Sequence, residues 1–306
     1  MNDSLLPPAK AALLPDVRAD LNQQLWVVEF LQPYAPLWLA RRAYDTAAML
    51  DKPSDLPPIV ETDFTFSGDD NSPLAARLYT PQQLVSPDGV QAPSPLLFYI
   101  HGGGYALGSL ASHTPTCRMF AAATGWRVLA ITYRRSPEHR FPAAPLDCLA
   151  IYRSVTSRAI EFGLNASRPQ IVIAGDSAGG QLTLELALRV RDGNRAGERL
   201  IQPVLLVPIY PAINSFKEAS QPSKRRYAAG YGVLTLASIH SYSSMYLGAT
   251  ADERAAFESD AYLNPDLQKD FTGLPPIILT TAEFDPLHDE GTCFDLHVWS
   301  CLVRSQ

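Results

Sequence analysis

The stretch IVIAGDSAGGQLTLELAL, residues 171–188, decides the fold of this chain. An apolar run enters the sequence Gly175-Asp176-Ser177-Ala178-Gly179, and a helical pattern leaves it. In this strand-turn-helix context the serine of a G-x-S-x-G motif sits on a sharp, strained turn that only small neighbours permit. The helix N-terminus behind the serine adds partial positive charge where an oxyanion forms. The stretch therefore predicts that Ser177 is a nucleophile.

Apolar runs alternate with helical patterns on both sides of this stretch. Over residues 95–281 the runs are PLLFYI, WRVLAITY, QIVIAG, PVLLVPIY and PPIILTT. Continuous apolar strands separated by helices indicate a parallel sheet covered on both faces. Before them, VETDFTF and LAARLYT flank a turn at GDDNSP and predict an antiparallel hairpin. Because ligands bind beyond the carboxyl ends of parallel strands, we expect the site at that edge.

The chain of 306 residues fits one catalytic domain with an added cap. Helical patterns within residues 1–55 predict N-terminal helices that contribute to the cap. We expect the catalytic domain over residues 56–211 and 265–306. Residues 212–264 interrupt the alternation and predict an inserted pair of helices, either a lid beside the site or a surface decoration without contact to substrate.

Composition excludes several classes of partner. The chain has 31 acidic against 25 basic residues, which leaves no basic footprint for nucleic acid. The N-terminus has no positive region followed by an uninterrupted apolar core, and no window supplies about 18 consecutive apolar residues. We therefore expect a cytoplasmic protein without a membrane span. The four cysteines show no CxxC pairing and no metal-ligand spacing, so no metal site is predicted.

A second motif, PLLFYIHGGGYALGS at residues 95–109, runs a strand into three consecutive glycines. Glycines let backbone N–H groups turn toward a reacting carbonyl oxygen. We assign the oxyanion donors to the N–H groups of Gly103, Gly104 and Ala178. The loop lacks a following Lys-Ser/Thr and a GxGxxG spacing, which argues against a phosphate-binding loop. We expect His101 to order this loop and not to act as a base.

Asp285 follows the apolar run PPIILTT directly and precedes a helical pattern. A serine, then an aspartate or glutamate, then a histidine is the order of a triad built on such a nucleophile turn. The position of Asp285 after Ser177 suits the orienting acid. A turn or cap residue before proline is the alternative role.

With these elements in order, the sequence closely resembles the hormone-sensitive lipase family of α/β-hydrolases, which includes bacterial carboxylesterases and acetyl esterases. The match rests on HGGGYALGS, YRRSPEHRFPAAPLDC, GDSAGG, PIYP and DPLHDEG. The resemblance implies the α/β-hydrolase fold, with a mostly parallel sheet, helices on both faces and a helical cap. It implies Ser177 as nucleophile, Asp285 as orienting acid and the HGGG glycines as oxyanion hole.

The resemblance also implies the chemistry. Small esters of short acyl chains are the expected substrates, with neither a metal nor an organic cofactor, and a homodimer is one possible assembly. The segment YRRSPEHRFPAAP departs from the family pattern Tyr-Arg-Leu-Ala-Pro-Glu-His at Arg135 and Ser136. We expect it to brace the loop under the site through Arg134, Glu138 and His139.

The family's catalytic histidine is not found in its usual place. In the family a last helix, a last strand and a loop with the histidine follow DPL-x-DEG, whereas 21 residues follow Asp285 here. The helical spacing of Phe294, Val298 and Cys301 predicts most of the last helix, and we expect the last strand to be missing.

None of the other histidines is a ready substitute. His297 stands twelve residues after Asp285, so a helix carries it roughly 18 Å from the strand ends. His288 stays in the loop and is the remaining candidate base. We expect His113 and His240 at the surface. Two functions follow: a carboxylesterase that forms an acyl-enzyme on Ser177, or a catalytically impaired or non-catalytic small-ligand-binding protein on the same fold, resembling the plant gibberellin receptors.

Overall fold

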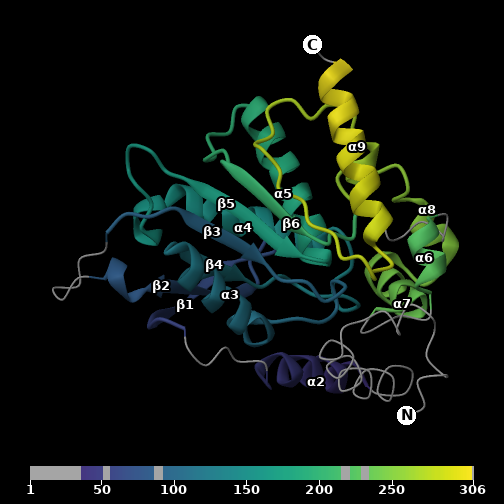
Figure 1. Ribbon diagram of the computed structural model, residues 1–306, viewed down its shortest axis with the longest axis horizontal. Helices are drawn as coiled ribbons and strands as arrows, with labels where there is room; N and C mark the ends of the chain where they lie inside the picture. Colours follow the sequence, from purple (N-terminus) through teal and green to yellow (C-terminus); the bar gives the residue numbers. More distant parts are fainter. Residues whose placement is uncertain (1–35, 51–55, 86–91, 215–220, 229–233, 305–306) are drawn as a thin grey trace.

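The computed structural model describes residues 36–50, 56–85, 92–214, 221–228 and 234–304. A six-stranded sheet in the order β1-β2-β4-β3-β5-β6 forms its centre (Figure 1). β1 and β2 form the predicted antiparallel hairpin, and β2 also pairs antiparallel with β4. β3, β4, β5 and β6 are parallel, as the alternating runs predicted. The strands span Ile59–Ser67 (β1), Pro73–Pro81 (β2), Leu96–Ile100 (β3), Arg127–Ile131 (β4), Ile171–Asp176 (β5) and Leu205–Ile209 (β6).

Helices cover both faces of the sheet. Alternate residues of β3 separate the faces: Phe98 belongs to the core under α4 and α5, whereas Tyr99 belongs to the core under α3. Phe294 of α9 packs into the α4 and α5 core. These helices are α3 (Leu110–Thr124), α4 (Ala143–Ser157), α5 (Ala178–Arg195) and α9 (His288–Arg304), and short 3-10 turns lie at Gln82–Leu84 (η3), Ala159–Phe162 (η4) and Pro265–Leu267 (η5).

The run PPIILTT forms a weaker edge than predicted. It pairs with β6 only through two isolated parallel bridges, Leu206 to Ile277 and Ile209 to Thr280. Leu206 donates to the carbonyl of Pro276 and accepts from the N–H of Ile278. Pro208 is the next residue of β6 in this ladder and has no N–H to donate, which interrupts the ladder between the two bridges. Within the described residues the sheet ends at this segment.

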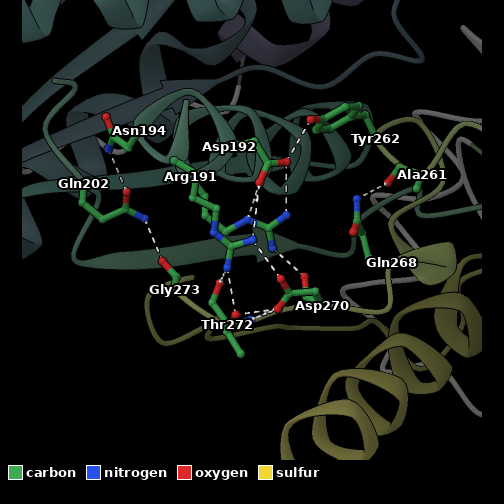
Figure 2. Close-up of polar contacts among 11 residues, drawn as sticks. Arg191, Asp192, Asn194, Gln202, Ala261, Tyr262, Gln268, Asp270, Thr272 and Gly273 are labelled. Carbon is green, nitrogen blue, oxygen red and sulfur yellow. Dashed lines mark hydrogen bonds and ion pairs between the residues drawn. The ribbon is translucent and has the colours of Figure 1, made fainter. Parts of the chain in front are cut away.

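The segment that leads to this edge is fastened to the C-terminal half of α5 (Figure 2). Tyr262 donates its hydroxyl proton to Asp192 at 2.8 Å, and Arg195 pairs with Asp270 at 2.8 Å. Gln202 donates to the carbonyl of Gly273 at 3.0 Å. These contacts give the chain a fixed starting point before it runs to Asp285.

The cap segments that the structure describes are α2 (Leu37–Leu50), α6 (Pro222–Arg226), α7 (Leu236–Leu247) and α8 (Ala251–Ala255). Figure 1 shows α6, α7 and α8 together beside the start of α9. Where the insertion is described, it holds three helices instead of the expected pair. Thr235 and Thr250 each form a capping box, which starts α7 and α8 as separate helices. The helices expected in residues 1–35 lie outside the described residues, and the division into cap and catalytic domain stays a prediction. No helix in the described part of the chain is long and apolar enough to cross a membrane.

Candidate active site

Ser177 lies on the sharp turn that the sequence predicted. Its φ of 55° and ψ of −118° are strained for a residue with a side chain. Its N–H donates to the carbonyl of Ile209 at 2.9 Å, and its own carbonyl accepts from Ala212 at 3.1 Å. The end of β5, the start of α5 and the chain after β6 therefore hold the turn together.

The small neighbours of Ser177 are required by close backbone contacts. A Cβ on Gly175 lies 2.4 Å from the carbonyl oxygen of Gly179. A Cβ on Gly179 lies 2.1 Å from the carbonyl oxygen of Ile100. Neither neighbour is a flexible side chain, so these positions accept only glycine without movement of the backbone.

The loop after β3 turns its backbone toward Ser177 through left-handed glycines. Gly103 has a φ of 108° and Gly104 a φ of 60°. The N–H of Gly102 donates to Asp176 Oδ1 at 3.0 Å. Among the described residues, no protein acceptor is recorded for the N–H groups of Gly103, Gly104 or Ala178. These are the three predicted oxyanion donors, and their role stays a prediction.

A largely apolar pocket opens over Ser177. Apolar side chains from the cap and from the start of α9 form its wall, together with the ring of Tyr242. A Cβ on Gly104 lies 2.4 Å from that ring, so α7 packs directly on the glycine loop. The full lining is Gly104, Tyr105, Ser177, Ala178, Ala212, Leu234, Ile239, Tyr242, Ser243 and Leu287.

Asp285 stands beside this pocket, two residues before Leu287. Its Oδ1 accepts from the N–H of Leu287 at 2.9 Å. Burial is the main cause that raises the pKa of Asp285 to about 6; Glu290 raises it further, and the Leu287 N–H and His288 oppose the rise. A pKa in this direction is typical of a buried carboxyl group without a close cation.

No histidine completes the arrangement. All six histidines lie in the described part of the chain, and none has a recorded side-chain contact with Ser177 or with the carboxylate of Asp285. The Nδ1 of His288 lies 3.0 Å from the carbonyl oxygen of Ala282. The Nε2 of His297 lies 2.6 Å from the carbonyl oxygen of Gln268. The general base is therefore unassigned, and the role of His288 stays a prediction.

The expectation of a surface position was wrong for His113 and correct for His240. His240 is exposed on α7, but His113 on α3 is only 6% exposed. The Nε2 of His113 lies 3.3 Å from Asp176 Oδ1. No motif surrounds His113, and its burial depends on how α3 packs against the end of β5.

The brace under the glycine loop differs in part from the expected one. Arg41 of α2 donates to the carbonyl oxygens of Ala106 and Ser136 at 2.8 and 2.9 Å, and it pairs with Glu138 at 2.7 Å. Arg135 donates to the carbonyl of Gly108 at 2.6 Å. Arg135 thus contacts the loop directly. Glu138 contacts it through Arg41, a residue that the sequence analysis did not predict to take part.

The two other residues of the expected brace lie away from the loop. Arg134 pairs with the buried carboxylate of Asp147 at 2.8 Å, on the side of the hairpin. His139 is exposed. In the described residues, no group of three His, Cys, Asp or Glu side chains is placed to hold a metal ion.

Comparison with known proteins places this geometry among ester hydrolases. A family model described as the alpha/beta hydrolase fold matches residues 97–300. Ethyl acetate hydrolase of Pseudomonas putida is 33% identical over 268 residues, which cover 87% of this chain and 78% of that protein. Acetyl esterase of Salmonella typhi is 31% identical over 274 residues, which cover 87% of this chain and 77% of that protein.

Solved structures of esterases are also similar to this chain. The hyperthermophilic esterase from the archaeon Pyrobaculum calidifontis has a TM-score of 0.77 and 28% identity, over 95% of this chain and 86% of that one. A bacterial heroin esterase has a TM-score of 0.79 and 28% identity, over 96% of this chain and 86% of that one. The likeness spans the sheet, the helices on both faces and the described cap.

Proposed function

The chain belongs to the esterase family of the α/β-hydrolase fold that includes hormone-sensitive lipase, and from that membership we propose that it is a carboxylesterase. The observation that carries the proposal is the pocket lined by strained Ser177 together with Gly104 and Ala178, whose N–H groups we assign as oxyanion donors. A nucleophile and preorganised donors at one point are the two parts that acyl transfer needs. The relatives named as ethyl acetate hydrolase and acetyl esterase support the same reaction.

In the proposed reaction, Ser177 Oγ attacks the ester carbonyl carbon. The N–H groups of Gly103, Gly104 and Ala178 donate to the oxygen that becomes negative. The C–O bond to the alcohol then breaks, the alcohol leaves with a proton, and an acyl group remains on Ser177. Water attacks that acyl group and releases the carboxylic acid. Removal of one oxyanion donor in such sites costs about 10² to 10³ in kcat.

The pocket favours small substrates with short acyl chains. Its wall carries Leu234, Ile239 and Leu287, and no charged side chain lines it among the residues that the structure describes. Tyr242 closes one side against Gly104. An apolar wall of this kind accepts an alkyl group and offers nothing to an ionic one.

The transfer of the hydroxyl proton from Ser177 is the step to which no residue is assigned. Without a base the hydroxyl stays protonated and is a weak nucleophile, and removal of the triad histidine lowers kcat on the order of 10⁶ in a well-studied serine protease. Asp285 has the position of the orienting acid, but no imidazole lies between it and Ser177. We therefore expect this chain to turn over esters slowly.

A second candidate function has one specific observation in its favour. Because none of the six histidine side chains contacts Ser177 or the carboxylate of Asp285, the pocket also suits a protein that binds a small apolar ester or acid without hydrolysing it. The intact donors and the strained serine favour the esterase, since a binding protein has no need of both.

Hydrolysis of p-nitrophenyl acetate and butyrate by this chain and by Ser177→Ala separates the two functions. Each assay is run with and without added imidazole, which can replace a missing histidine side chain as a diffusible base. For the esterase we expect a saturable rate that imidazole raises in the unchanged chain more than in Ser177→Ala.

Two outcomes oppose the esterase. Equal rates for the chain and Ser177→Ala, at every imidazole concentration, remove Ser177 as a nucleophile in this chain. Saturable binding of butyrate by calorimetry together with equal rates supports the binding protein. The control variant Ser300→Ala, on α9 and outside the pocket, is expected to match the unchanged chain in both assays.

A further inference from the structure

One carboxylate oxygen of buried Asp176, the residue directly before Ser177, is contacted by residues from three other parts of the chain. Asp176 Oδ1 accepts from the hydroxyl of Tyr99 at 2.7 Å and from the N–H of Gly102 at 3.0 Å. The Nε2 of His113 lies 3.3 Å from the same oxygen. The end of β5, the end of β3, the glycine loop and α3 thus meet at Asp176, next to Ser177.

The polar contacts around His113 favour a proton on both ring nitrogens. Nε2 faces a carboxylate oxygen, which can only accept. Nδ1 lies 2.9 Å from Ser112 Oγ, whose single proton is donated to the carbonyl of Ser109 at 3.0 Å. The hydroxyl oxygen can then only accept from Nδ1. An imidazole with protons on both nitrogens is an imidazolium, so this arrangement favours the cationic form of His113.

Electrostatics around the pair agree with the geometry. Burial alone lowers the pKa of His113, but the Asp176 carboxylate, the Ser109 carbonyl and Asp45 together raise it above its ordinary value. Burial alone raises the pKa of Asp176, and His113 and Tyr99 outweigh it and hold that pKa low. Each group therefore favours the charged form of the other.

The second histidine in this region is in the opposite state. His101 Nδ1 donates to the carbonyl of Gly102 at 2.8 Å, and its ring stacks on Tyr133 with centroids 4.4 Å apart. Burial, and next the charge of His113 with centroids 5.5 Å away, lower the pKa of His101 to about 3. His101 is thus neutral, and the cation of this pair of rings is His113.

The remaining titratable groups around His113 come from α2 and β3. Tyr44 of α2 lies beside the ring with centroids 6.4 Å apart, and Tyr99 of β3 lies 6.1 Å away. Asp45 of α2 accepts from Ser109 Oγ at 2.7 Å. Asp45 is thus a carboxylate near His113 in addition to Asp176. Like Asp176, it raises the pKa of His113 and favours the imidazolium.

We propose that His113 is a positioning residue, whose imidazolium holds the Asp176 carboxylate against the backbone of the glycine loop. This inference rests on the proposed role of that loop as the oxyanion hole. Asp176 accepts from the N–H of Gly102, and His101 donates to its carbonyl. Both backbone groups of Gly102, the residue before Gly103, are therefore held in place. A Cβ on Gly102 lies 2.3 Å from Asp176 Oδ2, which leaves no space between carboxylate and loop.

The charge of His113 also matters for the oxyanion. A lone buried carboxylate next to Ser177 repels the negative charge that develops on the substrate oxygen. With His113 charged, the pair is neutral overall. Because the pair then has no net charge, the N–H donors of the loop dominate the electrostatic field at the substrate oxygen.

The test needs no ester turnover. Nitrogen-15 NMR of the histidine side chains at pH 6.5 reports the state of His113, and hydrogen exchange reports the Gly102 N–H. We expect imidazolium signals from more than half of His113, since pH 6.5 is the ordinary histidine pKa. We expect the Gly102 N–H of His113→Leu to exchange about tenfold faster, which is the loss of one hydrogen bond.

His113→Gln is the conservative variant, because its amide can donate to Asp176 without a charge. It is expected to keep most of the Gly102 protection and to lower kcat more than it changes KM, if the esterase assay gives a rate. His240→Gln, at an exposed position on α7, is the control and should change neither measurement.

The inference fails if His113 is mostly neutral at pH 6.5, or if Gly102 exchange in His113→Leu equals that of the unchanged chain. If His113→Leu does not fold, the NMR state of His113 in the unchanged chain and the exchange in His113→Gln decide the question. Equal rates of the chain and Ser177→Ala on esters affect only the proposed function, so the two failures are distinguishable.

Discussion

The Nζ of Lys224 lies 2.7 Å from Oε1 of Glu290, and the two side chains are 1% and 0% exposed. The pair joins α6 of the insertion to α9, just after Asp285. Ser223 of the same short helix donates its hydroxyl proton to the carbonyl of Pro286 at 2.8 Å. The insertion therefore contacts the chain immediately after Asp285 and also farther along, in the first turn of α9.

Lys224→Met should destabilise the fold by about 3 to 5 kcal/mol, because it leaves a buried carboxylate without its cation. The double variant Lys224→Met, Glu290→Gln should recover most of that loss. Glutamine removes the charge and keeps an oxygen for the N–H of Asn214, which donates to Glu290 Oε2 at 3.1 Å. Urea unfolding of the unchanged chain, Lys224→Met, Glu290→Gln and the double variant measures the coupling, and equal losses in Lys224→Met and the double variant contradict a buried ion pair.

Gly179→Ala should cost about 3 kcal/mol or more, since its Cβ meets the backbone oxygen of Ile100 at 2.1 Å and the backbone cannot yield cheaply. Gly197→Ala is the matched comparison. Gly197 has a φ of 103° and no atom within 4 Å of an added Cβ, so its cost is conformational only, about 1 kcal/mol. Thermal unfolding of both variants ranks the two costs, and a smaller loss at Gly179 opposes the close approach.

Arg41→Gln should weaken the attachment of α2 to the glycine loop more than Glu138→Gln does. The Arg41 variant loses donors to the carbonyl oxygens of Ala106 and Ser136, about 1 kcal/mol each. Glu138 is 52% exposed, and exposed ion pairs contribute about 1 kcal/mol or less. Hydrogen exchange of residues 37–50 compares the two variants. Faster exchange in Glu138→Gln than in Arg41→Gln would falsify this ranking.

The parts of the site that the sequence predicted are those encoded locally. The turn at Ser177 and the loop at Gly103 and Gly104 follow from glycines within a few residues of a strand end. The role of Asp285 as orienting acid stays a prediction, made from its order along the chain. The parallel sheet followed from the apolar runs, although Pro208 prevented the last of them from forming a full ladder.

The contacts that the sequence did not predict join residues far apart in the chain. Arg41 reaches Ser136 across 95 positions, and Asp176 reaches Gly102 across 74. His113 is buried only because α3 covers the end of β5, and Lys224 only because a short helix lies on α9. No local pattern records such packing, and a lone histidine or lysine in a polar segment predicts a solvated side chain.

Asp285→Asn should stabilise the fold at pH 8 while it removes the carboxylate that we predict to be the orienting acid. The pKa of Asp285 is about 6 in the folded chain, whereas the ordinary value for an aspartate is 3.8. The folded state holds the proton more tightly, so the unfolding free energy falls as pH rises; the penalty is absent below 3.8 and complete above about 6. Asparagine removes that penalty and keeps the oxygen that accepts from Leu287. The gain should reach about 1 to 3 kcal/mol at pH 8 and shrink toward pH 4.5.

Urea unfolding of the chain and of Asp285→Asn at pH 4.5 and 8 measures this gain. Asp295→Asn, at an exposed position on α9, serves as the control for the loss of one surface carboxylate. A histidine base beside Asp285 would hold the carboxylate charged and reverse the sign, because asparagine would then leave the imidazolium without its partner. A loss of stability at pH 8 in Asp285→Asn therefore means that Asp285 has a cationic partner in solution. A gain means that the carboxyl group is buried without one, which is the state that leaves Ser177 without a base.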